Sequence, residues 1–511
     1  MTNEGVEYGS HGTIGSRSLI ARLVPIGLAI LALPACVSLA PAPSTPSIVD
    51  AMPAQFDHEG PSGATGEAYN PQAWWSAFED PVLNELIDDA LANNLDIAQS
   101  VARLEQVRSQ ARIARAAQFP NLEASVSASD SSSPLAGSAF GDLGGGAITR
   151  IENQTIAPSV SAAYELDLFA RNRNDAGAAR QDAIASAYDL QSVQLAAAAD
   201  TISTYFEIVN TRRQIELTIW IASALNDRVE STEAQFQRGL TGSFELYQIR
   251  QQLRATQASL PQLESALADA ENRLGVLVGA YPGALDETLS RPLTPRLVFE
   301  PVPAGLPAQL LEQRPDVAAA WTRLEAARLR IGARRAERYP QLSLSASFGA
   351  QGNTLSSGFD FAGNWTRSLA ASIVAPIFNA GRISANIRAA RAQYDENAAA
   401  YSAAVLGAFR EVDSAFADYE AQRQRYLLIT AQLDEARLSF DLQKRRYASG
   451  VGTYTAYLDA LTTVYQVRSD LSASAQAMAL ARLTIHRALA GDWLSSSAGE
   501  TETTSGTGET G

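Results

Sequence analysis

The chain has 511 residues, 46% of them hydrophobic, and its 55 acidic and 40 basic side chains give a formal net charge of −15 at pH 7. This acidic balance argues against a nucleic-acid partner, because phosphate binding requires clustered lysine and arginine. A single cysteine and three histidines exclude an intrachain disulfide and a Cys/His metal cluster. No nucleophile elbow, zinc-protease, Walker A or dinucleotide motif stands in a suitable context, so neither an enzyme nor a bound cofactor or metal is expected.

The amino terminus has the composition of an export signal. Arg17 and Arg22 precede a short apolar run over 23–33, which is about half of the ~20 residues that a membrane-spanning helix needs. The segment Leu33-Pro34-Ala35-Cys36 resembles the lipobox of bacterial lipoproteins, in which the cysteine is acylated and becomes the first residue. The sequence therefore predicts a lipoprotein signal over 1–35, with an ordinary signal cut elsewhere as the alternative.

The predicted anchor is followed by a tether. Cys36 is followed by Val37 and not by the aspartate that signals inner-membrane retention in lipoproteins, which favours the outer membrane. Several acyl chains together anchor a protein firmly, at roughly 0.8 kcal/mol per buried methylene. Residues 36–70 are rich in Pro, Ser, Ala and Gly and are typical of an extended lipidated tether. The acidic, polar tail over 492–511 is predicted to be disordered.

The rest of the chain contains an internal sequence repeat. Matching segments lie 220 positions apart at first and 211 positions apart further on, and the nine-residue loss falls in a Gly/Ser-rich region where deletions are tolerated. The sequence thus predicts two copies of one unit, over 71–285 and 308–491, joined by a linker over 286–307. The clearest matches are Asn94-Leu95-Asp96-Ile97 with Arg314-Pro315-Asp316-Val317, Phe119-Pro120-Asn121-Leu122 with Tyr339-Pro340-Gln341-Leu342, and Phe236-Gln237-Arg238-Gly239 with Tyr447-Ala448-Ser449-Gly450.

Each copy begins with a helix and continues with two alternating segments. The helices are predicted over about 82–118 and 308–338, the first opened by Asp80-Pro81, and each ends at a proline, Pro120 or Pro340. Apolar residues then alternate with serines, which is typical of strands with one apolar and one wet face. The predicted strands are 122–129 and 155–166 in the first copy, and 342–349 and 365–377 in the second.

Very long helices follow in each copy, over about 171–237 and 382–448, and at ~1.5 Å per residue each reaches about 100 Å. Apolar residues recur in them every seven positions, which indicates supercoiling against neighbouring helices. Gly239 and Gly450 stand where a left-handed cap ends a helix. The returning helices are predicted over about 243–279 and 454–490. The heptad positions are Ile215, Ala222, Val229 and Phe236, and Tyr426, Leu433, Phe440 and Tyr447.

Four short strands cannot close a membrane barrel, for which about eight is the minimum. In lipid an open sheet edge costs several kcal/mol for each unpaired backbone group. If these strands enter a membrane, several copies must share one barrel, with the apolar face outward and the serines lining a wet lumen. The helical hairpins then continue that lumen on the other side. The predicted fold is mainly α with a membrane β-barrel.

Several motifs resemble the outer-membrane factor (TolC-like) family, and the NodT-type lipoprotein branch of resistance-nodulation-division (RND) efflux systems fits best. The resemblance covers roughly 70–492 and implies a homotrimer with a shared twelve-stranded barrel, a long periplasmic α-barrel and an iris-like closure at its tip. It also implies a periplasmic adaptor (membrane fusion) protein and an inner-membrane RND transporter as partners. The motifs are Trp74-Trp75-Ser76-Ala77-Phe78-Glu79-Asp80-Pro81, Tyr164-Glu165-Leu166-Asp167-Leu168-Phe169 and Pro376-Ile377-Phe378-Asn379-Ala380-Gly381-Arg382.

The same resemblance suggests functional residues in two places. The turns between the long helices are candidate adaptor-docking tips, although their glycines also cap helices. Asp459 matches an aspartate that lines the constriction in family members, and the alternative is an ordinary acidic residue near a helix start. Three such carboxylates form a negative ring that disfavours anions. The tip residues are Gly239, Leu240, Thr241 and Gly242 in the first copy and Gly450, Val451, Gly452 and Thr453 in the second.

Four interpretations compete at this point. The leading one is the outer-membrane channel of a tripartite pump that exports drugs or toxic solutes. The exit duct of a type I protein-secretion system has the same fold and remains open. A lipid-anchored helical spacer without a pore explains the heptads but not the four alternating segments. An enzyme lacks a nucleophile or metal site in this sequence.

Overall fold

A computed structural model describes residues 38–44, 46–51, 53, 74–134, 150–299, 302 and 314–489 of the chain. The predicted signal segment over 1–35, the predicted lipidation site Cys36 and the tail over 492–511 lie outside the described residues. The chain divides into two compact units. The first unit comprises Met1–Ala42, Arg112–Ala178 and Arg328–Arg391, and the second comprises Pro43–Ala111, Ala179–Ala327 and Ala392–Gly511.

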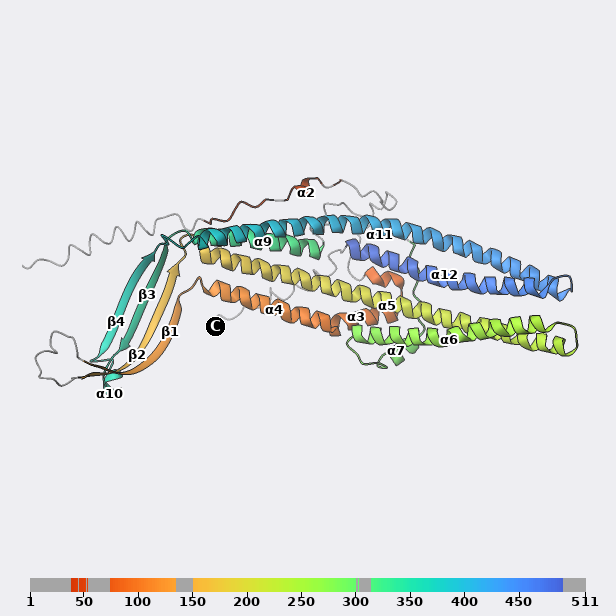
Figure 1. The fold of residues 1–511 in the computed structure, drawn as a ribbon, viewed down its shortest axis with the longest axis horizontal. Coiled ribbons are helices and arrows are strands. Elements are labelled where there is room, and N and C mark those ends of the chain that lie inside the picture. The colour runs from red at the N-terminus through yellow and green to blue at the C-terminus, as the bar shows by residue number, and fades with distance from the viewer. Residues whose placement is uncertain are drawn as a thin grey trace, which may run out of the picture. The chain divides into compact units, whose positions relative to one another are not determined.

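The first unit is built around one antiparallel sheet of four strands in the order β1-β2-β3-β4 (Figure 1). Each copy contributes one hairpin, and β2 of the first copy pairs with β3 of the second from Ser159↔Gly349 to Leu166↔Leu342. The loop between β3 and β4 contains the short helix α10, Leu355–Gly358. The strands are β1 Asn121–Pro134, β2 Arg150–Leu166, β3 Gln341–Ala350 and β4 Trp365–Val374.

The two hairpins differ from the predicted ones in length. In the first copy β1 and β2 have 14 and 17 residues, whereas β3 and β4 have 10 each. The prediction that the last strand runs to 377 is wrong, because Pro376 has no N–H to donate to the ladder. Ile377 and Phe378, beyond the end of β4, are 99% and 89% exposed.

The first predicted helix is two helices, α3 Pro81–Asn93 and α4 Leu95–Ala116. They are separated by Asn94, whose side-chain oxygen accepts hydrogen bonds from the backbone N–H groups of Asp96 and Ile97. An asparagine that caps the following helix in this way ends the preceding one. The prediction of one continuous helix over 82–118 is therefore wrong.

The two-fold internal repeat is confirmed by the positions of the elements. Helices α4 and α9, Pro315–Ala336, have 22 residues each and start 220 positions apart. Helices α5, Arg171–Gln237, and α11, Arg382–Ala448, have 67 residues each and start 211 positions apart. The nine-residue difference arises between the start of the first strand of each hairpin and the start of the long helix that follows, because the first copy has the longer hairpin.

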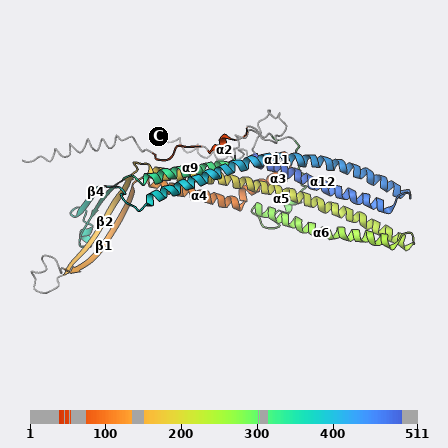
Figure 2. The same ribbon diagram turned by 45° about the horizontal axis from the view of Figure 1, so that its top comes forward.

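Long helical hairpins make up most of the second unit. Helix α5 pairs with α6, Ser243–Leu277, and α11 pairs with α12, Tyr454–Leu489 (Figures 1 and 2). Heptad residues pack where the hairpins meet, among them Ala222, Val229 and Phe440, which surround buried Leu225 and Leu458. Among the described helices, none combines the length and the apolar character that crossing a membrane requires.

Asp80 organises the core at the start of the first copy. Its buried carboxylate accepts hydrogen bonds from the backbone N–H of Val82, in the first turn of α3, and from that of Thr294 at 3.0 Å. The hydroxyl of the fully buried Tyr205 in α5 donates to the same carboxylate. The predicted Asp80-Pro81 helix start thus also ties together three segments that are far apart in the sequence. The core around it includes the 3-10 helix Trp74–Phe78 and the short helix α7, Asp286–Ser290.

Candidate functional site

The sheet has one apolar face and one hydroxyl-bearing face. Alternate residues of a strand point to opposite faces, and directly paired residues share a face, so the register assigns every side chain to a face. The apolar face carries Leu122, Ala124 and Val126 of β1, Val160, Ala162 and Tyr164 of β2, Leu342, Leu344, Ala346 and Phe348 of β3, and Leu369, Ala371 and Ile373 of β4. The other face carries Ser125, Ser127, Ser159, Ser161, Ser343, Ser345, Ser347, Ser368 and Ser372.

The apolar face is exposed to an unusual degree. Leu369 and Ile373 of β4 are 84% and 70% exposed, and Leu122 of β1 is 71% exposed. On the opposite face hydroxyls bridge neighbouring strands, as Ser347 Oγ and Ser368 Oγ do at 2.8 Å. An apolar surface of this kind next to a polar one suits a wall between lipid and water.

Both edges of the sheet are available for further pairing. In the described residues β1 pairs only with β2, and β4 pairs only with β3. Each edge therefore presents a row of backbone N–H and C=O groups without strand partners among the described residues. Such edges recruit another strand, and no irregular edge survives in lipid.

The two predicted tips have matching geometry at one end of the helical unit (Figure 1). Gly239 and Gly450 adopt positive φ, 68° and 77°, and a Cβ at either position would meet no atom within 4 Å. The next residues close each helix, since Leu240 N donates to Gln235 O and Val451 N donates to Arg446 O. These are Schellman-type caps, whose positive φ glycine adopts without the steric strain that a Cβ would cause.

The remaining predicted tip residues lie in the same two turns. Gly242 is the residue before α6, and Thr453 Oγ1 accepts a hydrogen bond from Ala456 N at the start of α12. Leu240 and Val451 are both 72% exposed. Each turn therefore presents one bare aliphatic side chain beside a glycine, while Thr241 and Gly452 are half-buried.

Asp459 lies in the second turn of α12 and its side chain is exposed. Its neighbours Leu458 and Ala460 are buried against the helical core, so the helix turns the carboxylate away from that core. The backbone carbonyl of Asp459 accepts a hydrogen bond from Thr463 Oγ1 at 2.7 Å. The carboxylate itself is left to face outward.

Arg228 of α5 lies among three tyrosines, a cluster that sequence reasoning missed. Its guanidinium carbon is 5.0, 4.7 and 5.0 Å from the ring centres of Tyr447, Tyr454 and Tyr457. Tyr447 lies in the last turn of α11, and Tyr454 and Tyr457 lie in the first turn of α12. One cation therefore joins a helix of the first copy to both helices of the second hairpin. The only hint in the sequence was a charged residue next to the heptad position Val229.

A polar seam runs along α5 and α12 toward this cluster. Asn210, Gln214 and Thr218, spaced by four residues, accept or donate hydrogen bonds to α12. Ser472 donates to Asn210 Oδ1 at 2.7 Å, Ser469 donates to Gln214 Oε1 at 2.6 Å, and the hydroxyls of Thr218 and Tyr465 lie 3.1 Å apart. Directional polar contacts of this kind fix the register of the two antiparallel helices. The seam and the tyrosine cluster therefore join the two hairpins along this stretch.

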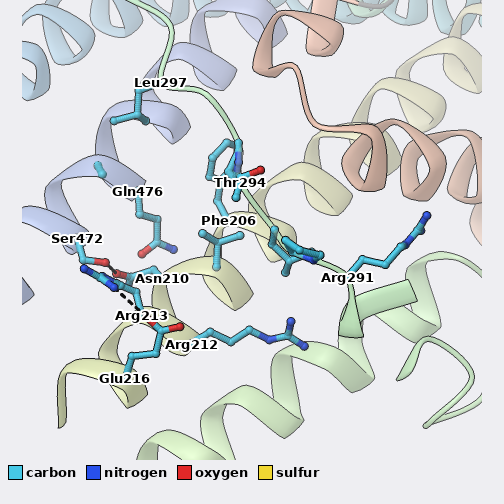
Figure 3. A pocket seen from close by; sticks show the side chains of 15 residues that line it. Phe206, Asn210, Arg212, Arg213, Glu216, Arg291, Thr294, Leu297, Ser472 and Gln476 are labelled. Carbon is cyan, nitrogen blue, oxygen red and sulfur yellow. Dashed lines mark hydrogen bonds and ion pairs between the residues drawn. The ribbon is translucent and has the colours of Figure 1, made fainter. Parts of the chain in front are cut away.

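A cavity of about 510 Å³ opens beside the seam, between α5, α12 and the segment 291–297. Figure 3 shows Ser472 and Asn210 at one wall of this cavity and Arg291 at another. Its three arginines have carboxylate partners, so the cavity offers no uncompensated arginine charge to an anion. The pairs are Arg212 with Glu271, Arg213 with Glu216 and Arg291 with Glu85.

A duplicated helix, hairpin and helical-hairpin order, with a two-faced sheet that is open at both edges, defines a subunit of an outer-membrane channel. The chain belongs to the outer membrane efflux protein family, whose model matches residues 86–280 and 306–491. It acts in the outer membrane as an efflux component.

Relatives of known name agree with this assignment. The chain is 30% identical over 472 residues to the pyoverdine export outer membrane protein OpmQ of Pseudomonas putida, covering 92% of this chain and 97% of that protein. It is 30% identical over 483 residues to the cation efflux system protein CusC of Escherichia coli O6:H1, covering 92% and 99%. The open-state MtrE outer membrane channel of Neisseria gonorrhoeae superposes with a TM-score of 0.75 at 25% identity, covering 89% and 99%.

Proposed function

We propose that three copies of this chain form one closed conduit through the outer membrane and the periplasm, as the exit channel of a tripartite pump that exports drugs or other toxic solutes. The observation that carries this proposal is the four-stranded sheet with an exposed apolar face and two unpaired edges. Three such sheets, joined β4 to β1, give twelve strands and leave no edge, and twelve is an even number within the range of known barrels.

The same geometry sets the character of the pore. With the apolar face toward lipid, the serine face lines the lumen, and small hydroxyls bind water without selecting one solute chemistry. The proposal therefore assigns substrate choice to the inner-membrane transporter. The partners are an RND transporter and a periplasmic adaptor that docks on the tips, where Leu240 and Val451 offer exposed aliphatic contacts.

We also propose that the channel is closed at the tips in its resting state. Three copies of Asp459 facing a common axis would give a ring of negative charge, which attracts cations and repels anions. Arg228 would hold the second hairpin against α5 through its three tyrosines, at an expected 0.5 to about 2 kcal/mol for each favourable contact. Opening would require this cluster to separate.

The amino terminus fits the same picture. Cys36 would carry the acyl chains that hold each copy to the inner leaflet of the outer membrane, in contact with its lipid. The support is the sequence around Cys36, where the only cysteine of the chain follows a short apolar run.

Disulfide cross-linking tests the shared barrel directly. Ser368→Cys on β4 is combined with one cysteine on β1, at Ser125 or Ser127, in a Cys36→Ser background. Within one chain β1 and β4 are three strand spacings apart, about 14 Å, which is too far for a disulfide. Oxidation of the double variants is expected to give covalent trimers, at the β1 position that matches the register.

Single-cysteine variants serve as controls and should stay monomeric on denaturing gels. Purified protein that is monomeric in mild detergent, with no conductance in planar bilayers, would overturn the proposal.

A further inference from the structure

We infer that helix α9 and the first turn of α5 form a docking groove for the segment that follows Cys36, and that this groove fixes where the amino-terminal lipid enters the membrane. The segment Ser38–Ser44 is called the strap below. The inference rests on the proposed acylation of Cys36, but the groove and the strap both lie within the described residues of the first unit, apart from the last two strap residues.

Two arginines hold the backbone of the strap. Arg335 Nη1 donates to the carbonyl of Leu39 at 3.1 Å, and Arg328 Nη1 donates to the carbonyl of Pro41 at 2.8 Å. Ser38 Oγ donates to Asn174 Oδ1 at 3.0 Å. Because the two guanidiniums bind carbonyls, they fix the path of the backbone, and hydrogen bonds from a charged donor are stronger than neutral ones.

Gly332 makes room for the strap. It lies four residues after Arg328 and three before Arg335, so the three share one face of α9. A Cβ on Gly332 would lie 2.7 Å from Ala40 N and 2.6 Å from Asn174 Nδ2, closer than real Cβ contacts come. Any larger residue at 332 must displace the strap or Asn174, so glycine is required here by close approach and not by backbone conformation.

The order of the contacts gives the strap a direction. Leu39 is held by the later arginine of α9 and Pro41 by the earlier one, so the strap runs antiparallel to the helix. Followed back toward Cys36, the chain leads to the end of α9 from which β3 begins at Gln341. Cys36 is two residues before Ser38, a reach of about 7 Å.

The direction has a consequence for the lipid anchor. The acyl chains would leave the protein at the junction between α9 and β3, beside the end of the apolar sheet face that lies next to the helices. A free tether would let the lipid enter the membrane over a wide radius, since a flexible chain spans about 5–6 Å times the square root of its length. The docked strap instead holds the anchor against its own barrel.

Spin labelling of the full-length, membrane-extracted protein tests the groove. A nitroxide on Ala42→Cys reports strap motion, because this position is exposed and tolerates a label. The unaltered groove is expected to give a largely immobilised spectrum, and Gly332→Leu a largely mobile one. Gly407→Leu in α11 is the matched control, since a Cβ there meets no atom within 4 Å, and it should leave the spectrum unchanged.

Milder variants guard against misfolding. The double variant Arg328→Ala/Arg335→Ala should also release the strap. Arg338→Ala, at an exposed position just beyond the end of α9, should not. A spectrum in Gly332→Leu and in the double arginine variant that stays as immobilised as the parent would overturn the inference.

Intact mass separates this inference from the proposed lipidation. An acylated mass with a mobile strap in the parent protein means that the anchor exists and the groove does not hold it. An unacylated Cys36 with an immobilised strap means that the groove holds an amino terminus without lipid, which refutes the proposed anchor and the role of the groove in placing it. A Cys36→Ser variant is expected to keep the immobilised spectrum, because the contacts that hold the strap are made by Ser38, Leu39 and Pro41.

Discussion

The guanidinium carbon of Arg228 in α5 lies 4.7 Å from the ring centre of Tyr454 in α12, so a cation of the first repeat is held by an aromatic ring of the second. Tyr447 and Tyr457 complete the cluster, and their own ring centres are 5.7 Å apart. Nothing in the repeat itself requires this contact, because the equivalent positions of the two copies carry different residues.

Replacement of Arg228 by alanine is expected to loosen the second hairpin at the tip. Loss of the cation from three rings removes on the order of 1–3 kcal/mol. Single-channel recording should show a higher open probability than in the parent. Arg254→Ala in α6 is the control, since its side chain is exposed and donates a hydrogen bond to Gln257 of the same helix. Equal open probability in both variants would contradict the proposal that Arg228 and its three tyrosines hold the tip closed.

Replacement of Asp459 by alanine is expected to weaken cation binding at the constriction. In planar bilayers the variant should show a larger conductance or less block by divalent cations, because a ring of three carboxylates is removed. Asp470→Ala is the control; this half-buried aspartate of the same helix accepts a hydrogen bond from Gln466 Nε2 at 3.0 Å, and the variant should behave as the parent does. An unchanged block in Asp459→Ala would remove this residue from the proposed gate.

The buried His486 near the end of α12 predicts a loss of stability in acid. Burial, with the nearby Arg482, lowers the pKa of His486 to about 3. In the unfolded chain the same imidazole has a pKa of about 6.5. Between about pH 6.5 and pH 3 the unfolded chain therefore binds a proton that the folded chain does not bind. This contribution to stability is complete above pH 6.5 and is lost at about 1.4 kcal/mol per pH unit as the pH falls toward 3.

The measurement is thermal unfolding of the helices, followed by circular dichroism, between pH 7.5 and 4. His486→Gln cannot take up the proton and should show a shallower decline than the parent. Parallel declines in the two proteins would show that other groups dominate the acid sensitivity.

Replacement of Tyr205 by phenylalanine is expected to destabilise the core around Asp80. The buried carboxylate loses one donor and keeps those from Val82 and Thr294, a cost of about 1–3 kcal/mol. Burial and the hydrogen bond to Asp80 raise the pKa of Tyr205, so the phenol stays a donor at all ordinary pH values. Chemical denaturation measures the change, and a double-mutant cycle with Asp80→Asn should show coupling between the two residues.

The sequence predicted those features that depend on local patterns. The serine alternation located four strands, and the absence of proline with heptad spacing located α5 and α11 at their observed bounds. Asn94 was missed as a helix boundary because an asparagine within a helical pattern is only weakly informative until its side chain is seen to cap the next helix.

Contacts between segments that are distant in the chain could not be predicted from the sequence. The partners of Arg228 are more than 200 residues away, and no spacing rule joins them. The strap was predicted only as part of an extended tether because its composition is that of a linker. The two arginines and Gly332 that contact it have no sequence feature that distinguishes them from ordinary helix residues. Such pairings depend on which helix faces meet, and packing decides that.

The unequal hairpins have a consequence for the extracellular face. Strand β1 has four residues more than β3, about 13 Å of extended chain, and the first half of β2 rises beyond its partner in the second copy. In a ring of three subunits, long and short hairpins would alternate, so the rim of the barrel would rise at the three long hairpins and drop at the three short ones. Any antibody or phage that approaches from outside would then meet threefold and not sixfold symmetry, with the first copy of the repeat presented foremost.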